Sequence, residues 1–217
     1  MNKHLQRLVE KYPDLEPVVG DVAAAAGLLS DCYRRGGKAL FCGNGGSAAD
    51  SEHLVGELMK GYLRARPVSQ DVRRRLRDAF PQEGDYLADH LQGALPAISL
   101  VSQTALLTAY ANDVAADMIF AQQVYGYGVE GDVLVGISTS GNSGNVLHAL
   151  RVARAMGLHT LGFTGQDGGA MTALCDVAVR VPWQATADIQ ERHLAIYHAL
   201  CAKLEDEFFS DSRDSRN

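Results

Sequence analysis

The stretch ALFCGNGGSAADSEHLVGELM, residues 39–59, decides the fold of this chain. It begins with a short apolar run, which a glycine-rich loop follows. From Ser47 onward the apolar residues have helical spacing, so the stretch predicts a strand, a tight turn and a helix. Residues 132–156, DVLVGISTSGNSGNVLHALRVARAM, repeat this order with a loop rich in serine. Because strand–loop–helix units build parallel α/β sheets, we expect ligands beyond the carboxyl ends of the strands, where both loops fall.

The flanking segments continue the alternation of strands and helices. Three further short apolar runs predict strands, which makes a doubly wound parallel sheet of five strands flanked by helices. The additional strands are expected at 97–101, 159–163 and 176–181. Helices are expected at 103–111, 115–127, 143–156 and 187–209, with Asn112-Asp113 separating the first two.

A chain of 217 residues corresponds to one domain, since domains usually hold about 100–200 residues. Within residues 1–217 we expect N-terminal helices over 1–36, broken at Tyr12-Pro13, with the second helix starting near Glu16. An arginine-rich segment, 63–93, interrupts the pattern and predicts a helical insertion with helices near 70–79 and 85–92. The polar residues 210–217 predict a frayed tail.

Composition excludes several classes of protein. The chain is 47% hydrophobic and 21% charged with a net charge of −6, which argues against a nucleic-acid binder. It has no apolar run of about 18 residues, so we expect no membrane partner, and its first residues lack the apolar core of a secretory signal. The four cysteines show no paired spacing, which predicts buried free thiols in a reducing, cytoplasmic location.

The first loop, residues 42–47, has the character of an anion site. Glycines let the backbone approach an anion, and the following helix N-terminus supplies free N–H groups and a positive dipole end. Gly43, Gly45 and Ala48 also match the dinucleotide fingerprint G-x-G-x-x-A, but the acid expected about 20 residues later is missing. The hypothesis of a nicotinamide-dependent oxidoreductase therefore rests on this fingerprint alone. The other alternative is that the loop is a tight turn that binds no ligand.

The second loop, residues 138–143, carries four hydroxyl side chains at the start of a helix. Capping requires one such residue, whereas phosphate oxygens are held by several neutral donors and backbone amides. The motif G-x-x-x-x-G-K-[ST] is absent, so the loop favours a phosphate on a small molecule over a nucleoside triphosphate. Capping without a ligand is the alternative.

Two predicted helices carry pairs of metal-ligand side chains. His53 and Glu57 are four residues apart, and Gln190 and His198 are eight apart, so each pair shares a helix face. Nitrogen and oxygen donors of this kind form tetrahedral zinc sites. His193 lies about 60° around the helix from Gln190, a position suited to supporting a ligand. Solvated or core side chains at the same spacing remain the alternative.

These stretches resemble the sugar isomerase (SIS) domain and, more narrowly, the phosphoheptose isomerase family. The resemblance covers roughly residues 16–208 apart from the insertion, and is carried by CGNGGSAADSEHLVGEL, ANDVAADMIFAQQV, GDVLVGISTSGNSGNVLHA and TADIQERHLAIYH. It implies a flavodoxin-like SIS fold and the isomerisation of sedoheptulose 7-phosphate to D-glycero-D-manno-heptose 7-phosphate. It also implies a homotetramer with active sites between subunits.

The resemblance implies a role for each matching residue. Glu57 and His198 match the catalytic residues. One zinc ion per subunit is implied, with His53, Glu57, Gln190 and His198 as ligands. The residues that match contacts to the phosphorylated seven-carbon sugar are Asn44, Gly45, Gly46, Ser47, Asp113, Ser138, Thr139, Ser140, Ser143 and Gln190.

The residue types suit this chemistry. Aldose–ketose isomerisation moves a proton between C1 and C2 through an enediol, and a carboxylate with a histidine can do this when burial brings their pKa values toward neutrality. A metal would polarise the carbonyl. If both Glu57 and His198 bind zinc, neither is free as a base, so either substrate displaces one of them or the metal is structural or inhibitory.

Two positions depart from the family. The family commonly has an arginine shortly after the catalytic carboxylate, where this chain has Gly61, so Lys60, Arg64 or Arg66 is expected to substitute. An acid, Asp188, stands where the family often has arginine. These departures leave open another six- or seven-carbon ketose phosphate. The runner-up hypothesis is a non-catalytic SIS module for phosphosugar binding or protein interaction; the relatives of that kind lack the carboxylate and second histidine present here.

Overall fold

The computed structural model describes residues 2–210. Within them, five parallel strands form one sheet in the order β2-β1-β3-β4-β5. The strand order reverses between β1 and β3, which confirms a doubly wound, flavodoxin-like sheet and makes the carboxyl ends of these two strands the expected ligand position. The strands are β1 (Ala39–Gly43), β2 (Ala97–Ser99), β3 (Val133–Ile137), β4 (His159–Thr164) and β5 (Val177–Arg180).

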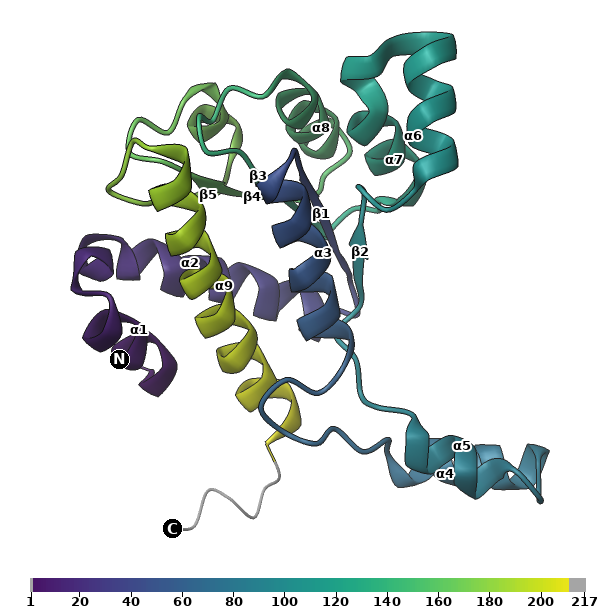
Figure 1. The fold of residues 1–217 in the computed structure, drawn as a ribbon. Helices are drawn as coiled ribbons and strands as arrows, with labels where there is room; N and C mark the ends of the chain where they lie inside the picture. Colours follow the sequence, from purple (N-terminus) through teal and green to yellow (C-terminus); the bar gives the residue numbers. More distant parts are fainter. Residues whose placement is uncertain (1, 211–217) are drawn as a thin grey trace.

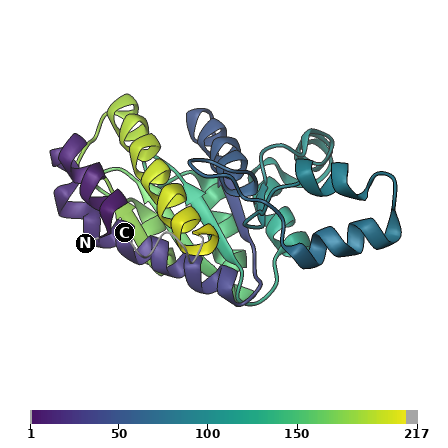
Figure 2. The same cartoon turned by 90° about the horizontal axis from the view of Figure 1, so that it is seen from below.

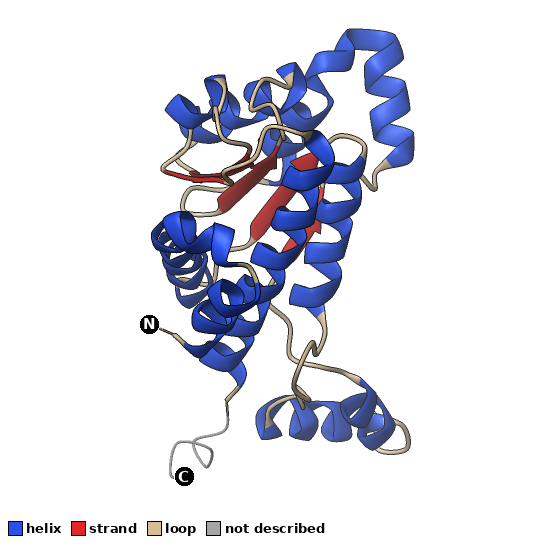
Figure 3. Ribbon diagram, turned by 60° about the vertical axis from the view of Figure 1, so that its left-hand side comes forward, coloured by secondary structure: helices blue, strands red, loops and turns tan. Residues whose placement is uncertain are grey.

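Helices cover both faces of the sheet, as the strands between two helical layers in Figure 3 show. One face packs against helices from both ends of the chain, and α3 lies beside α9 along it (Figure 1). The helices of this face are α1 (Lys3–Lys11), α2 (Val19–Arg34), α3 (Gly46–Met59) and α9 (Thr186–Phe209). The opposite face carries α7 (Ile119–Tyr127) and α8 (Gly144–Ala155), with α6 (Thr104–Tyr110) beside them.

Alternation along each strand divides the core into two. In β1, Ala39 and Phe41 pack toward the α2–α9 face, whereas Leu40 and Cys42 pack toward α7 and α8. All four are at most 1% exposed. This is the continuous apolar run expected of a strand buried on both sides. The cysteines are free, with Cys175 half-buried and the other three buried.

The arginine-rich segment forms a helical hairpin that projects from the body (Figures 1 and 2). Its helices are α4 (Gln70–Ala79) and α5 (Gly84–His90). Helix α4 buries no residue, and two of its arginines pair across the hairpin, with Arg77 Nε 2.6 Å and Arg73 Nη1 3.1 Å from Asp85 Oδ1. These ion pairs join the two helices, and α5 contributes the buried Gly84 and Ala88.

Two predicted boundaries were wrong. The second N-terminal helix begins at Val19, because the residues before it form a 3-10 helix, Pro13–Val18, that contains Pro17 and so lacks that residue's N–H donor. The predicted separation of two helices around Asn112-Asp113 is confirmed, but the second helix begins at Ile119 instead of residue 115. Ala111–Ala115 is a π-helix that ends in the extended residue Ala115, and the 3-10 turn Ala116–Met118 follows. The side chains of Asn112 and Asp113 bond to each other at 2.8 Å instead of capping a helix end.

The predicted tail, 210–217, lies outside the described residues except for Ser210. No helix within residues 2–210 combines the length and apolarity that crossing a membrane requires. A further 3-10 helix, Ala170–Leu174, precedes β5.

Candidate active site

The two loops meet where the strand order reverses. Strands β1 and β3 are neighbours, so the loops after them lie side by side. The amides of Asn44 and Asn145 bond to each other in both directions, each at 2.9 Å, and join the loops. Helices α3 and α8 begin directly after these loops, so two positive helix ends meet at this point.

The hydroxyls of the second loop are arranged by short local bonds. The hydroxyls of Ser138 and Ser143 lie 3.0 Å apart, and Ser140 Oγ accepts the N–H of Asn142 at 3.2 Å. Gly141 has φ +65°, and a Cβ there would lie 2.0 Å from the carbonyl oxygen of Gly168. Only glycine fits this crossing, which fixes the path of the hydroxyl-rich loop.

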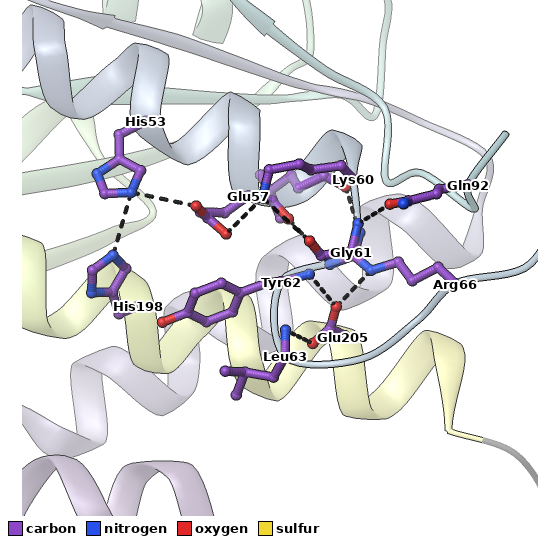
Figure 4. A network of polar contacts seen from close by, with 11 residues as sticks. His53, Glu57, Lys60, Gly61, Tyr62, Leu63, Arg66, Gln92, His198 and Glu205 are labelled. Carbon is purple, nitrogen blue, oxygen red and sulfur yellow. Dashed lines mark hydrogen bonds and ion pairs between the residues drawn. The ribbon is translucent and has the colours of Figure 1, made fainter. Parts of the chain in front are cut away.

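Three of the predicted functional side chains gather between α3 and α9 (Figure 4). His53 Nε2 lies 3.4 Å from Glu57 Oε1 and 3.5 Å from His198 Nε2. The imidazole rings are nearly perpendicular, with centroids 5.0 Å apart. The structure therefore brings the two predicted catalytic residues, Glu57 and His198, together with the predicted metal ligand His53.

The donors of this cluster suit a zinc ion. A tetrahedral ion with bonds of about 2.0–2.1 Å keeps its ligands about 3.4 Å apart, which is the spacing of His53 from its two neighbours. Glu57 Oε2 is buried and accepts no hydrogen bond from the described residues. The described part of the chain does not, however, hold three such side chains already arranged around a metal position.

Gln190 lies near the N-terminal end of α9, on the same helix face as His198. It is about two helical turns before His198 on α9. Its amide lies against the first residue of α3, so a Cβ at Gly46 would meet Gln190 Nε2 at 2.4 Å. Gln190 therefore stands between the glycine-rich loop and the histidine cluster.

His198 sits in an aromatic setting. The ring of Tyr62 stacks on it with centroids 5.6 Å apart and planes at 24°. Burial and the neighbouring His53 lower the pKa of His198, which favours its neutral form. A cavity of about 410 Å³ opens beside it, and includes the basic side chains of Arg7 and Lys11. The imidazole is therefore accessible to a ligand.

A buried ion pair fixes the last turn of α3, which contains Glu57 (Figure 4). Arg66 Nε donates to Glu205 Oε1 at 2.8 Å, and both residues are 1% exposed. The guanidinium also donates to the carbonyls of Glu57 at 3.1 Å and Leu58 at 2.8 Å, which lie in the last turn of α3. Removing one partner of such a pair costs about 3–5 kcal/mol of folding stability.

Of the three basic residues expected to replace the family arginine, the structure brings Lys60 to the cluster. Its Nζ lies 3.6 Å from Glu57 Oε2. Arg64 instead bonds to Asp206 at 2.7 Å, and Arg66 is committed to Glu205. Gly61 itself is held by the side chain of Gln92 at 2.6 Å, where the hairpin returns to the body.

Two predicted residues lie elsewhere. Asp113 is exposed in the π-helix that follows α6. Helix α6 lies on the side of the molecule away from α9 (Figure 1). His193 does not support a ligand, which corrects the expectation from helical spacing. It is 0% exposed and bonds to the carbonyl of Thr164 at 3.3 Å, with its ring against Phe163. Its face of α9 is directed into the core.

Three residues of the site escaped sequence reasoning. Tyr197 O–H donates to Asp50 Oδ1 at 3.2 Å and lies 2.9 Å from His53 Nδ1. Asn145 joins the loops as described. Asn145 lies two residues after the serine-rich loop and Asp50 precedes His53 by three residues, so their positions beside known motifs were available signals. Tyr197 gave none, because an aromatic residue on a packed helix is ordinarily core.

Comparison with known proteins supports one family. The chain matches the SIS domain family over residues 77–165. It is 43% identical to the phosphoheptose isomerase of Rhodospirillum rubrum over 185 residues, 85% of each chain. It is 46% identical to that of Desulfovibrio desulfuricans over 173 residues, 80% of this chain and 70% of the relative.

Solved structures agree. The structure of the phosphoheptose isomerase from Neisseria gonorrhoeae is similar, with a TM-score of 0.73 at 35% identity, covering 94% of this chain and 95% of that one. A phosphoheptose isomerase from Francisella tularensis has a TM-score of 0.74 at 31% identity, covering 90% and 91%.

Proposed function

Because this chain belongs to the phosphoheptose isomerase family, we propose that it interconverts sedoheptulose 7-phosphate and D-glycero-D-manno-heptose 7-phosphate. The observation that carries the proposal is the cluster of His53, Glu57 and His198 on the face that runs down from the two loops. A carboxylate beside an imidazole is the pair that proton transfer through an enediol requires.

The loops at the strand reversal are proposed to hold the phosphate and the sugar. The positive ends of α3 and α8 favour the phosphate's negative charge, and the hydroxyls supply neutral donors. The proposed contacts are Asn44, Gly45, Gly46, Ser47, Ser138, Thr139, Ser140, Ser143 and Gln190. We add Lys60 in place of the family arginine, because its ammonium lies beside Glu57.

The proposed reaction moves one proton between carbons. Glu57 removes a proton from C1 of the ketose as the carbonyl oxygen at C2 gains negative charge, which gives the enediolate. His198 moves the hydroxyl proton from O1 to O2, and Glu57 returns its proton to C2 to give the aldose. Both groups end as they began, so the step needs no oxidant or reductant.

We propose zinc as the cofactor, one ion per subunit, with His53, Glu57, Gln190 and His198 as its ligands. The buried oxygen of Glu57 that accepts no hydrogen bond from the described residues and the spacing of His53 from its neighbours support this. When bound, the ion would stabilise negative charge on the sugar oxygens. This proposal has three distinct forms: the substrate displaces one of the ligands, the ion is structural, or the ion is inhibitory.

A homotetramer with sites between subunits is also proposed. It accounts for Asp113, which a neighbouring subunit would bring to the site. The apolar side chain of Val114, the residue after Asp113, supports a partner there, since it is 65% exposed. Free cysteines support a cytoplasmic location.

The test is proton NMR of sedoheptulose 7-phosphate in D₂O with the wild-type protein and with Glu57→Gln. We expect the aldose to appear with deuterium at C2 only with wild type, because the amide of the variant cannot accept the proton. Near-normal turnover by a folded Glu57→Gln variant would overturn the role of Glu57. Wild-type protein without turnover or exchange on this and other ketose phosphates would favour the non-catalytic module.

A further inference from the structure

Two polar groups, Tyr197 and Asp50, form a chain that ends at Nδ1 of His53, the ring nitrogen that does not face Glu57 and His198. Tyr197 is 1% exposed and its hydroxyl lies 3.2 Å from Asp50 Oδ1 and 2.9 Å from His53 Nδ1. The tyrosine and histidine rings meet edge to face, with centroids 5.4 Å apart. His53 is thus held at one nitrogen while its other nitrogen faces the cluster.

The bonding capacity of these groups determines where the protons lie. A carboxylate only accepts hydrogen bonds, and a phenol has a single proton to donate. Because Tyr197 gives that proton to Asp50, its oxygen is left to accept from His53, whose Nδ1 must then carry hydrogen. A neutral imidazole has one N–H, so His53 Nε2 keeps its lone pair.

The opposite arrangement turns an Nε2–H of His53 toward Glu57 Oε1, but at 3.4 Å this contact is longer than an ordinary N–H···O hydrogen bond and does not offset the loss at Asp50. If Tyr197 donated to His53 Nδ1, Asp50 Oδ1 would face a phenolic oxygen at 3.2 Å with no proton between them. Asp50 Oδ2 is already buried and without a partner among the described residues. Both carboxylate oxygens would then be unsatisfied, which costs about 1–3 kcal/mol or more for a charged group.

We propose that Tyr197, anchored on Asp50, is a positioning residue that holds His53 in the Nδ1–H tautomer and directs its Nε2 lone pair at Glu57 and His198. Metal-binding histidines are generally fixed in this way through their second nitrogen, and loss of the supporting bond weakens metal affinity about 10–100-fold. The effect on zinc rests on the proposed function, whereas the tautomer does not.

The test reads the tautomer directly in metal-free protein. Long-range proton–nitrogen spectra of ¹⁵N-histidine-labelled protein, recorded well above the ordinary histidine pKa of ~6.5, distinguish a protonated from an unprotonated ring nitrogen. The signals of His53 are identified by their loss in His53→Gln. We expect a protonated Nδ1 and an unprotonated Nε2 in wild type.

Two variants move the proton in a defined way. Tyr197→Phe removes only the hydroxyl and should release His53 from the Nδ1–H form. Asp50→Ala keeps the hydroxyl but removes its acceptor, so Tyr197 should donate to Nδ1 and His53 should switch to the Nε2–H form. A wild-type His53 with protonated Nε2, or spectra unchanged in both folded variants, would overturn the proposal.

Zinc affinity gives the second readout. Competition with a chelator should show about 10–100-fold weaker zinc binding by Tyr197→Phe. Tyr33→Phe is the matched control, because the Tyr33 hydroxyl is also buried but has no partner within the described residues; it should bind zinc as wild type does. Equal zinc affinity in all three proteins would overturn the effect on the metal. Wild-type protein that binds no zinc would instead refute the proposed cofactor, and the tautomer would still decide the positioning role.

Discussion

Replacing Gly46 with alanine tests whether the position of the Gln190 amide matters for catalysis. A Cβ at residue 46 would lie 2.4 Å from Gln190 Nε2 and 2.8 Å from Gln190 Cδ, whereas ordinary contact begins at 3.4 Å. The amide must therefore move by about 1 Å. Gly46 has no positive φ, so alanine is compatible with the first turn of α3. The amide is the end of a flexible side chain, so the fold is expected to accommodate the change.

We expect the substitution to lower catalytic activity and to leave the stability of the fold nearly unchanged. Displacement of a functional group by about 1 Å lowers activity on the order of 100-fold, which corresponds to about 2.7 kcal/mol of transition-state stabilisation. We expect kcat/KM of Gly46→Ala to fall by this factor while Tm stays within a few degrees of wild type. Steady-state isomerisation and thermal unfolding measure the two quantities.

A matched glycine separates the site effect from helix propensity. Gly27 lies inside α2 with nothing within 4 Å of its Cβ position. Gly27→Ala should raise stability by about 0.5–1 kcal/mol and leave kcat/KM unchanged. Activity of Gly46→Ala within threefold of wild type would refute the reasoning, since the amide would then have no required position.

Two further predictions concern charge. Lys60→Ala should lower kcat/KM on the order of tenfold, or about 1.4 kcal/mol, because a charged contact is lost. Lys60→Arg keeps the positive charge and should retain most activity. Equal losses in the two variants would contradict a role for the charge of Lys60. Burial lowers the pKa of His193 from 6.5 to about 4, so the unfolded chain binds the proton first. Stability is therefore full above pH 6.5 and should fall by up to about 3 kcal/mol as pH drops to 4. Urea unfolding at fixed protein concentration checks this, and His193→Gln with an unchanged pH dependence would contradict it.

The sequence alone determined the architecture. Strand and helix periodicity is a local property, so the order of elements and their approximate ends could be read from the chain. Alternation of strands and helices then restricts the topology to a parallel doubly wound sheet, which places the two loops at the strand reversal. The pair of His53 and Glu57 was also readable, because a separation of four residues on one helix fixes a shared face.

Only the tertiary structure decided which faces meet. Helical spacing placed His198 on the face of Gln190 and His193 beside it as a supporting residue, but packing turned His193 into the core and His198 toward His53. Tyr197 reaches Asp50 across 147 positions, and Arg66 reaches Glu205 across 139. The rotation of α9 against α3 depends on every contact that buries them, including α1 and the sheet, so no local pattern in either helix specifies these partners.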